Sequence, residues 1–494
     1  MLEDREGGLW FTTHENGVYY LPPDFLQAYD QRTGLSSAKV THINTYKHDI
    51  AVQQSDFSFS LTTANKDSWQ SARIGKNINY ALFGREGSIY YLSTSGKVLR
   101  GKRYIHLPSS RIYSSGRHVW GTWVDSLSRY DDKGHKKYDL PVAVPYFVSL
   151  YESENEHLLL GSLEGLFLYA EGKLHRLTLT PSVYKERMSD IKELDKEHLL
   201  VATSGKGILV IDKKSYCIVR QITAADGLKN MICNVVRCDD SGVVWAGTNG
   251  GLYRIEHILD KSRTRVQWAD IHNGINSNEI NDICIIEQNL WLATAKGISI
   301  FPRNKNLSFT DSIPVRIQNL KVNGKARNTM LSLNLDHDQN NISISFIGLN
   351  YQYADVLQYR YRLLGNGKEI WSYTHDPSVN YNALPPGDYI FEYGAMAPNQ
   401  SGKIYTATFS FSIAPPFWQR WWFIFIVVVV VLSCISLFIR YRIRSIQRQV
   451  KLKTDLSIYR DKALRDQMSP HFIYNALNTI QNYILKHDTD MSVS

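Results

Sequence analysis

Short apolar strands separated by glycine-containing turns recur through the N-terminal part of the chain. The clearest unit spans residues 239–253, where a turn leads into Val-Val-Trp-Ala-Gly-Thr and a second apolar strand follows Gly250-Gly251. Weaker copies carry a Thr or Ser marker, and the markers at positions 122, 162, 203, 248 and 294 are 40, 41, 45 and 46 residues apart. A period of this length, with several short strands per unit, predicts the four-stranded blades of a β-propeller.

The number of blades depends on two degenerate copies, near residues 50–52 and 84–90. With them, about seven blades fit into residues 34–313, and residues 1–33 remain as part of another blade. An open solenoid is the structural alternative, but units rich in strands and without helices favour a closed ring. The Trp that recurs in the units is expected to pack within the blades, because the same position in every blade cannot face one ligand.

The pattern changes after residue 313. Residues 314–416 lose the repeat and show alternating polarity in five segments, at 315–320, 342–346, 357–363, 389–393 and 407–411. About a hundred residues of short strands and turns is the size of an immunoglobulin-like β-sandwich. The expected fold class is therefore mainly β, with a seven-bladed propeller followed by this sandwich.

A candidate membrane span follows at residues 421–439, an uncharged run of mostly Val, Ile, Phe and Leu. Nineteen residues of helix rise about 28 Å, enough to cross a hydrocarbon core of about 30 Å. Basic residues come directly after the run and mark the cytoplasmic side. We therefore expect residues 1–420 outside the cytoplasm and residues 440–494 inside it. An outside domain implies a signal peptide, and none is visible, so the sequence is expected to be a fragment.

The charge of the chain changes this picture little. The formal net charge is +9, and six basic residues fall between positions 440 and 453. The basic balance therefore needs no nucleic-acid partner, and no nucleic-acid motif appears. The five Cys and the His residues lack zinc spacing, so no metal site is expected. Residues 440–466 place apolar side chains three and four apart with one phase shift, which suits a basic, dimeric coiled-coil linker.

Candidate chemistry is concentrated at His471, whose neutral imidazole can accept a phosphoryl group. On a helix, one face would carry residues at i, i+4, i+8 and i+11, namely Gln467, His471, Asn475 and Asn478. These carboxamides would lie beside the ring and hold its tautomer. Pro470 is expected to bend the helix next to the acceptor.

Residues 467–475, Gln-Met-Ser-Pro-His-Phe-Ile-Tyr-Asn, resemble the phosphoacceptor box of the LytS-type sensor histidine kinases. The repeats resemble two-component-regulator propeller repeats, and residues 314–416 resemble the tyrosine-rich immunoglobulin-like (Y_Y_Y) module that follows them. The resemblance implies a single-pass, homodimeric receptor of the bacterial inner membrane. It would sense an extracytoplasmic ligand, in many relatives an oligosaccharide, and pass phosphate from His471 to a response regulator. Asn475 and Gln467 are the residues expected to orient the imidazole.

Phosphorylation would need ATP and Mg²⁺, held by a catalytic domain with an Asn box and a Gly-rich lid. No such motif follows the box, so residues 467–494 are interpreted as the start of a phosphoacceptor domain, and no cofactor is expected to bind this chain alone. One alternative function is a membrane-anchored glycan-binding module without kinase activity. A propeller enzyme ranks last, because no unit carries an insertion with convergent carboxylates.

Overall fold

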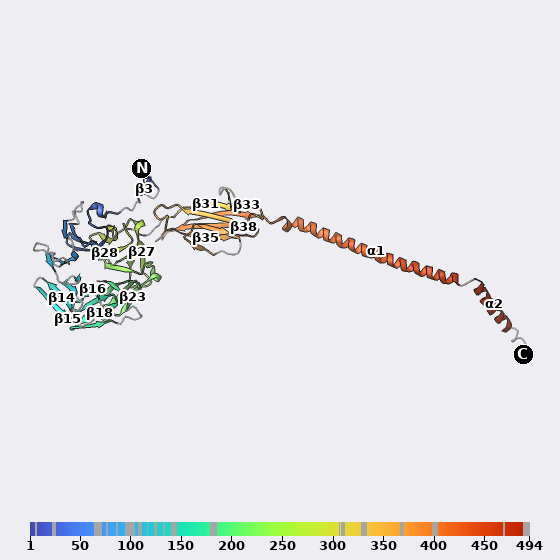
Figure 1. Cartoon of the computed structure of the whole chain (residues 1–494), viewed down its shortest axis with the longest axis horizontal. Helices are drawn as coiled ribbons and strands as arrows, with labels where there is room; N and C mark the ends of the chain where they lie inside the picture. The colour runs from blue at the N-terminus through green and yellow to red at the C-terminus, as the bar shows by residue number, and fades with distance from the viewer. Residues whose placement is uncertain are drawn as a thin grey trace.

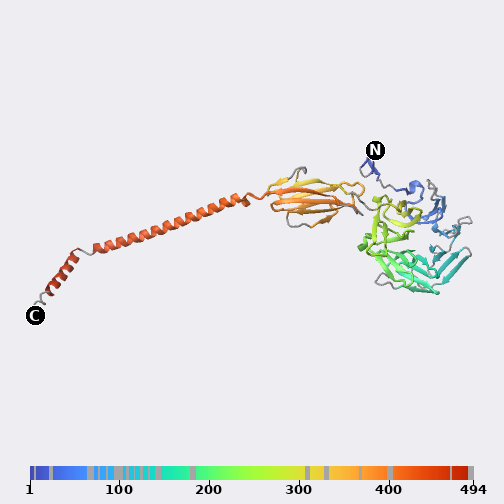
Figure 2. The same ribbon diagram turned by 180° about the vertical axis from the view of Figure 1, so that it is seen from behind.

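The computed structural model describes residues 1–4, 7–21, 26–63, 72–75, 78–84, 87–93, 104–106, 111–115, 117–122, 126–131, 134–139, 146–177, 185–305, 307, 312–327, 333–365, 370–397, 404–467 and 470–487. Within these residues the chain is mainly β-structure, followed by two C-terminal helices. Figure 1 shows a ring of small sheets, then a unit of two larger sheets, then a long helix that leads to a shorter one. Figure 2 shows the same order from behind.

Seven small sheets make up the ring in the part of the chain that the structure describes. Their strands are β5 (Val40–Tyr46), β6 (Asp49–Gln54), β7 (Phe59–Thr63) and β8 (Ala72–Gly75); β9 (Ile78–Phe83), β10 (Ile89–Ser93) and β11 (Tyr104–His106); β12 (Arg111–Ser114), β13 (Val119–Thr122), β14 (Ser126–Asp131) and β15 (Gly134–Asp139); β16 (Phe147–Glu152), β17 (Leu158–Ser162), β18 (Gly165–Ala170) and β19 (Lys173–Arg176); β20 (Met188–Glu193), β21 (His198–Thr203), β22 (Ile208–Asp212) and β23 (Ile218–Ile222); β24 (Cys233–Cys238), β25 (Val244–Thr248), β26 (Gly251–Glu256) and β27 (Arg265–Ala269); and β28 (Ile280–Ile286), β29 (Asn289–Thr294), β30 (Gly297–Pro302) and β4 (Ala28–Tyr29).

The ring closes on itself, which rules out the open solenoid. The first strands of consecutive sheets contact one another in order, and β28 of the last sheet contacts β5 of the first. The last sheet takes its fourth strand from the N-terminal side, because β4 pairs with β30 through Ile298 and Tyr29. The ring therefore begins at Ala28, not at residue 34 as the repeat pattern indicated. A two-residue strand far from its sheet in sequence leaves no pattern to detect.

The recurring Trp packs inside the blades, as predicted. Trp245 is 1% exposed, and its Nε1 donates a hydrogen bond of 3.0 Å to Asp239. The other carboxylate oxygen of Asp239 accepts hydrogen bonds from the backbone of the same turn, among them that of Val243. Asp4 and Trp10 repeat this arrangement at 2.9 Å. The Asp thus folds the turn while it satisfies the buried indole.

The second sequence marker, Gly followed by an apolar residue, also has a structural reason. Three 3₁₀ turns with side-chain caps occur in the described residues just before a marker: η1 (Gln31–Thr33), η3 (Ala224–Asp226) and η4 (Ile271–Asn273). Each ends at a glycine with φ between 89° and 116°, a conformation that favours Gly. The apolar residue that follows each glycine is then buried in the ring.

Residues before the ring form a separate three-stranded sheet of β1 (Leu2–Glu3), β2 (Leu9–Thr12) and β3 (Val18–Leu21). This sheet lies beside the second unit in both views (Figures 1 and 2). The ring of Trp10 meets that of Tyr351 edge to face, with centroids 4.9 Å apart.

The second unit consists of two sheets around one apolar core. One sheet holds β32 (Lys325–Arg327), β31 (Val315–Val322), β34 (Ile342–Gly348) and β37 (Ser378–Tyr381), and the other holds β33 (Leu333–Leu335), β39 (Thr406–Ile413), β38 (Gly387–Met396), β35 (Gln358–Leu364) and β36 (Ser372–Thr374). Phe346 of the first sheet is fully buried, with ring centroids of Tyr359, Phe391 and Tyr393 of the second sheet within 5.8 Å. This contact of large aromatic rings joins the two sheets.

The C-terminal part is helical: η5 (Phe417–Gln419), α1 (Trp421–Gln467) and α2 (Pro470–His487). Within the described residues α1 is the one helix long and apolar enough to cross a membrane. It has 47 residues and continues without a break through the basic stretch that follows the apolar run. At 1.5 Å per residue its length is about 70 Å, more than twice a hydrocarbon core.

Candidate functional site

Helix α2 places polar and apolar side chains on opposite faces. His471, Asn475 and Asn478 follow at i, i+4 and i+7 and share the polar face. The opposite face carries an apolar row, called here the α2 stripe, which consists of Ile473, Leu477, Ile480 and Ile484. Burial of the α2 stripe against a partner therefore leaves the imidazole of His471 facing away from the contact.

The side chain of Asn475 holds the ring of His471. Its Nδ2 lies 3.0 Å from Nδ1 of the ring, and both side chains are exposed. With the carboxamide turned by 180°, Oδ1 instead accepts a hydrogen bond from Nδ1–H, which leaves the lone pair on Nε2. In that tautomer Nε2 is the nucleophilic nitrogen and points away from Asn475.

Gln467 lies on a different helix from His471. It is the last residue of α1, whereas His471 is the second residue of α2. Pro470 separates them, because a proline has no N–H to donate and its ring clashes with the carbonyl four residues earlier. The face expected to run from Gln467 to Asn478 is therefore continuous only for the three residues in α2, namely His471, Asn475 and Asn478. The side chain of Gln467, with all of Met468 and Ser469, lies outside the described residues.

The α2 stripe has no partner surface in the described part of this chain. Its four side chains are between 41% and 61% exposed. An amphipathic helix that leaves an apolar row in water is stabilised by packing that row against another element. A second copy of the helix offers the same row, so the stripe fits a paired arrangement.

The chemistry available at His471 is that of a nucleophile without its own base. No carboxylate of the described residues is hydrogen-bonded to its ring, whose partner is Asn475. A neutral imidazole can attack phosphorus unaided by a base, provided that the donor phosphate is positioned and its charge is neutralised. No group of three or more His, Cys, Asp or Glu side chains in the described residues could hold a metal ion for that purpose.

The ring of seven sheets contacts the second unit through His272, a contact called here the histidine clamp, which the sequence analysis did not predict. His272 in η4 has Nδ1 3.0 Å from Asp270 and Nε2 2.7 Å from Asp355, which lies after β34 of the second unit. Asn273 donates a hydrogen bond of 2.9 Å to the hydroxyl of Tyr353. The hydrogen bond to Asp270 raises the pKa of His272, burial opposes this, and Asp355 adds to the increase. Both ring nitrogens face carboxylates, so the clamp favours the imidazolium.

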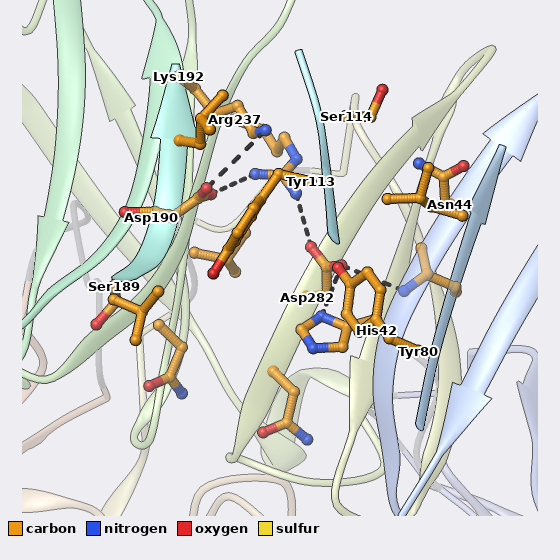
Figure 3. Close-up of a pocket in the computed structure, with 18 of the residues that line it drawn as sticks. His42, Asn44, Tyr80, Tyr113, Ser114, Ser189, Asp190, Lys192, Arg237 and Asp282 are labelled. Atoms are coloured by element: carbon orange, nitrogen blue, oxygen red, sulfur yellow. Dashed lines mark hydrogen bonds and ion pairs between the residues drawn. The ribbon is translucent and has the colours of Figure 1, made fainter. Parts of the chain in front are cut away.

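A second feature missed from sequence lies at the centre of the ring, where a cavity of about 150 Å³ is lined by charged side chains (Figure 3). Arg237 of β24 bridges Asp190 of β20 at 2.5 Å and Asp282 of β28 at 2.7 Å. His42 lies 3.6 Å from Asp282, and Lys192 lies 3.9 Å from Asp190. Burial alone raises the pKa of Asp282, but Arg237 and then His42 hold it below its ordinary value. The group joins the first strands of four sheets.

Comparisons with known proteins agree with this arrangement. Two family models match the chain, the Y_Y_Y domain at residues 350–414 and Histidine kinase at residues 459–493. A curated relative, Histidine kinase P4 of Formosa agariphila, is 23% identical over 342 residues, which cover 62% of this chain and 24% of the relative. The chain thus spans about a quarter of the length of that relative.

A solved structure supports the fold. The extracellular domain of the putative hybrid two-component system BT3049 from B. thetaiotaomicron matches with a TM-score of 0.67 and 18% identity, over 84% of this chain and 61% of that one. At this identity the match bears on the fold alone. Helix α1 is the one candidate membrane span among the described residues. Residues 350–414 are thus similar to the Y_Y_Y domain and residues 459–493 to the Histidine kinase family, in agreement with the curated relative.

Proposed function

We propose that the chain senses a ligand outside the cytoplasm and presents His471 for phosphorylation on the other side of the membrane. The observation that carries this proposal is the geometry of α2, which puts His471 and Asn475 on the face opposite the α2 stripe. His471 is the phosphoacceptor, and Asn475 orients its ring through the contact with Nδ1. A role for Gln467 in orienting the ring stays a prediction, since α1 and α2 are separate helices.

The architecture that supports sensing is a seven-bladed propeller followed by an immunoglobulin-like sandwich. The seven sheets joined in a closed ring support the first element, and the two sheets around Phe346 support the second. Residues 314–416 then correspond to the sandwich, and residues 421–439 to the part of α1 within a bacterial inner membrane. The basic residues from Arg440 onward favour a cytoplasmic position for the rest of α1 and for α2.

We extend the proposal to the partners of the cytoplasmic helices. The exposed α2 stripe supports a homodimer in which two copies of α2 bury it. A response regulator would take the phosphoryl group from His471. ATP and Mg²⁺ would be brought by a catalytic domain, and the oligosaccharide class of ligand stays a prediction. The glycan-binding module without kinase activity has no support among the matches.

Phosphotransfer can be tested with a related histidine kinase catalytic domain and radiolabelled ATP. We expect acid-labile label on the wild-type chain, none on His471→Gln, and normal labelling of His487→Gln, a control on the same helix. Asn475→Ala should label several-fold more slowly, because the ring then loses the side chain that orients it. Label that persists in His471→Gln would exclude His471 as the acceptor.

A further inference from the structure

A groove opens at the rim of the ring, where the first four sheets meet. It has a volume of about 430 Å³ and is lined by residues of all four sheets, among them His42, Arg111 and Tyr113. This volume lies within the range of pockets that bind small molecules. His42 and Tyr113 also line the charged cavity at the centre (Figure 3), so the groove leads inward to the ion pairs of Arg237.

Two large aromatic rings stand at the edges of this groove. Phe57, in the turn after β6, and Tyr146, just before β16, are each 52% exposed and both line the groove. Other aromatic side chains of the ring, such as Trp245 and Tyr253, are buried between sheets. Exposed aromatic rings on either side of a cavity offer flat apolar surfaces to a ring-shaped ligand.

The backbone of Phe57 supports a role for its side chain. Its φ of 59° lies in the left-handed region, which is strained for a residue other than Gly. Most other turns in the described residues fill this conformation with polar residues such as Glu156, φ 58°, or with glycine, and Tyr216 and Ala383 are the exceptions. Since the ring of Phe57 is half exposed, burial of its side chain does not offset the full cost.

The groove has a cation and no described carboxylate in its lining. The guanidinium of Arg111 stacks on Tyr146, 4.4 Å from the ring centroid, and its Nε donates a hydrogen bond of 2.6 Å to the hydroxyl. Tyr146 thus fixes the plane of Arg111, and Tyr113 also accepts a hydrogen bond from it. A guanidinium has five N–H groups, so donors are left for a further partner. A planar guanidinium held in this way pairs best with a carboxylate or a similar oxyanion.

The back of the groove is lined by polar side chains. The hydroxyl of Tyr113 donates a hydrogen bond of 2.7 Å to the carbonyl of Phe147. Burial raises the pKa of Tyr113 to about 12, so the phenol stays neutral at any pH that the cell meets. His42 lies beside it in the lining shared with the central cavity. The floor is therefore polar.

From these observations we infer that the groove is the sensor site for a small ring-containing carboxylate, whose acid group pairs with Arg111 while its ring lies between Phe57 and Tyr146. The inference rests on the proposed sensing function and names the class of its ligand. Tyr146 comes just before β16, and His272 comes before β28; each of these strands is the first of its sheet. The groove and the histidine clamp to the second unit therefore both lie at the N-terminal ends of first strands. A bound ligand therefore occupies the face of the ring that carries the second unit.

Calorimetric titration of the full chain in detergent tests the site. The probes are D-glucuronate, an acidic sugar, and phenylacetate, an aromatic acid, each of which has a ring and a carboxylate. The controls are glucose, which lacks the carboxylate, and acetate, which lacks the ring. We expect one of the two ring carboxylates to bind, and Arg111→Met to weaken it at least about tenfold through the lost charged pair. Glucose and acetate should bind at least about tenfold more weakly than that probe.

Phe57→Gly separates binding from folding. It removes the aromatic surface and relieves the backbone, so we expect weaker binding with a Tm no lower than that of the wild type. Glu156→Gly, at a matched turn, should preserve the Tm and leave binding unchanged. Failure of both ring carboxylates to bind below about 10 mM, or equal binding by Arg111→Met, would overturn the site. Phosphorylation of His471 is measured in a separate experiment, so failure of the ligand site would not contradict the role of His471 as phosphoacceptor.

Discussion

Replacement of Arg237 by Met should destabilise the ring strongly. The guanidinium holds two carboxylates whose side chains are 16% and 11% exposed, and it is 22% exposed itself. Removing one partner of a buried ion pair costs about 3–5 kcal/mol, and partial exposure places this case near the lower end. About 3 kcal/mol corresponds to a decrease in Tm of about 6–12 °C for a domain of this size.

The pH dependence of this loss gives a sharper test. In the wild type the pKa of Asp282 is below its ordinary value, so its contribution is present above the unfolded pKa of about 4 and is lost as pH falls through the folded value. Without Arg237 the buried carboxylate can relieve its cost by taking a proton. The Tm deficit of Arg237→Met should therefore decrease between pH 8 and pH 5.

Thermal unfolding followed by Trp fluorescence measures both effects. Arg129→Met is the control, because its partner Glu156 is 66% exposed and the pair should contribute little. The triple variant that adds Asp190→Asn and Asp282→Asn should recover part of the lost Tm, because it removes the two unpaired carboxylates. Recovery should be incomplete, because Lys192 and His42 then lose their partners. A deficit below about 2 °C at pH 7, or one that grows on acidification, would refute the reasoning.

Three further changes test other parts of the molecule. Asp355→Asn should weaken the contact with His272 by about 1 kcal/mol. Because the pKa of His272 is raised in the folded protein, this contribution is full below about pH 6.5 and is lost as pH rises through the folded pKa. Hydrogen exchange of residues 350–356 measures the effect. Gly297→Ala puts a Cβ 2.0 Å from the carbonyl oxygen of Tyr29, so β4 should separate from β30 and become open to limited proteolysis. Pro470→Ala should let α1 and α2 join, and spin labels on the two helices should move apart.

The repeat period was sufficient to predict a ring of small sheets, because successive units keep a Thr or Ser marker at a spacing of 40–46 residues. The two-sheet unit and α1 were equally accessible, since alternating polarity and an uncharged run are local signals. The fourth strand of the last sheet could not be predicted, because β4 pairs with a strand some 270 residues later through two residue pairs. Local patterns do not report such a pairing.

The charged group around Arg237 and the groove at Phe57 were missed for a related reason. His42 and Asp282 are 240 residues apart and meet only when the ring closes. One signal was present: Asp190, Asp282 and His42 occupy the same position in the first strands of their units, just after the register shift of each strand. Alignment of the units by that position would have placed their polar side chains around one axis.

Helix α1 also determines how motion can cross the bilayer. It runs as one rod from Trp421 to Gln467, so it has no joint at which a change outside could be absorbed. What the second unit imposes on the outer end must reappear at the inner end as tilt, translation or torsion of the whole rod. Torsion has a simple signature: each residue removed from the rod turns everything beyond it by about 100°. Signalling output in a series of single-residue deletions should therefore rise and fall with the pitch of the helix.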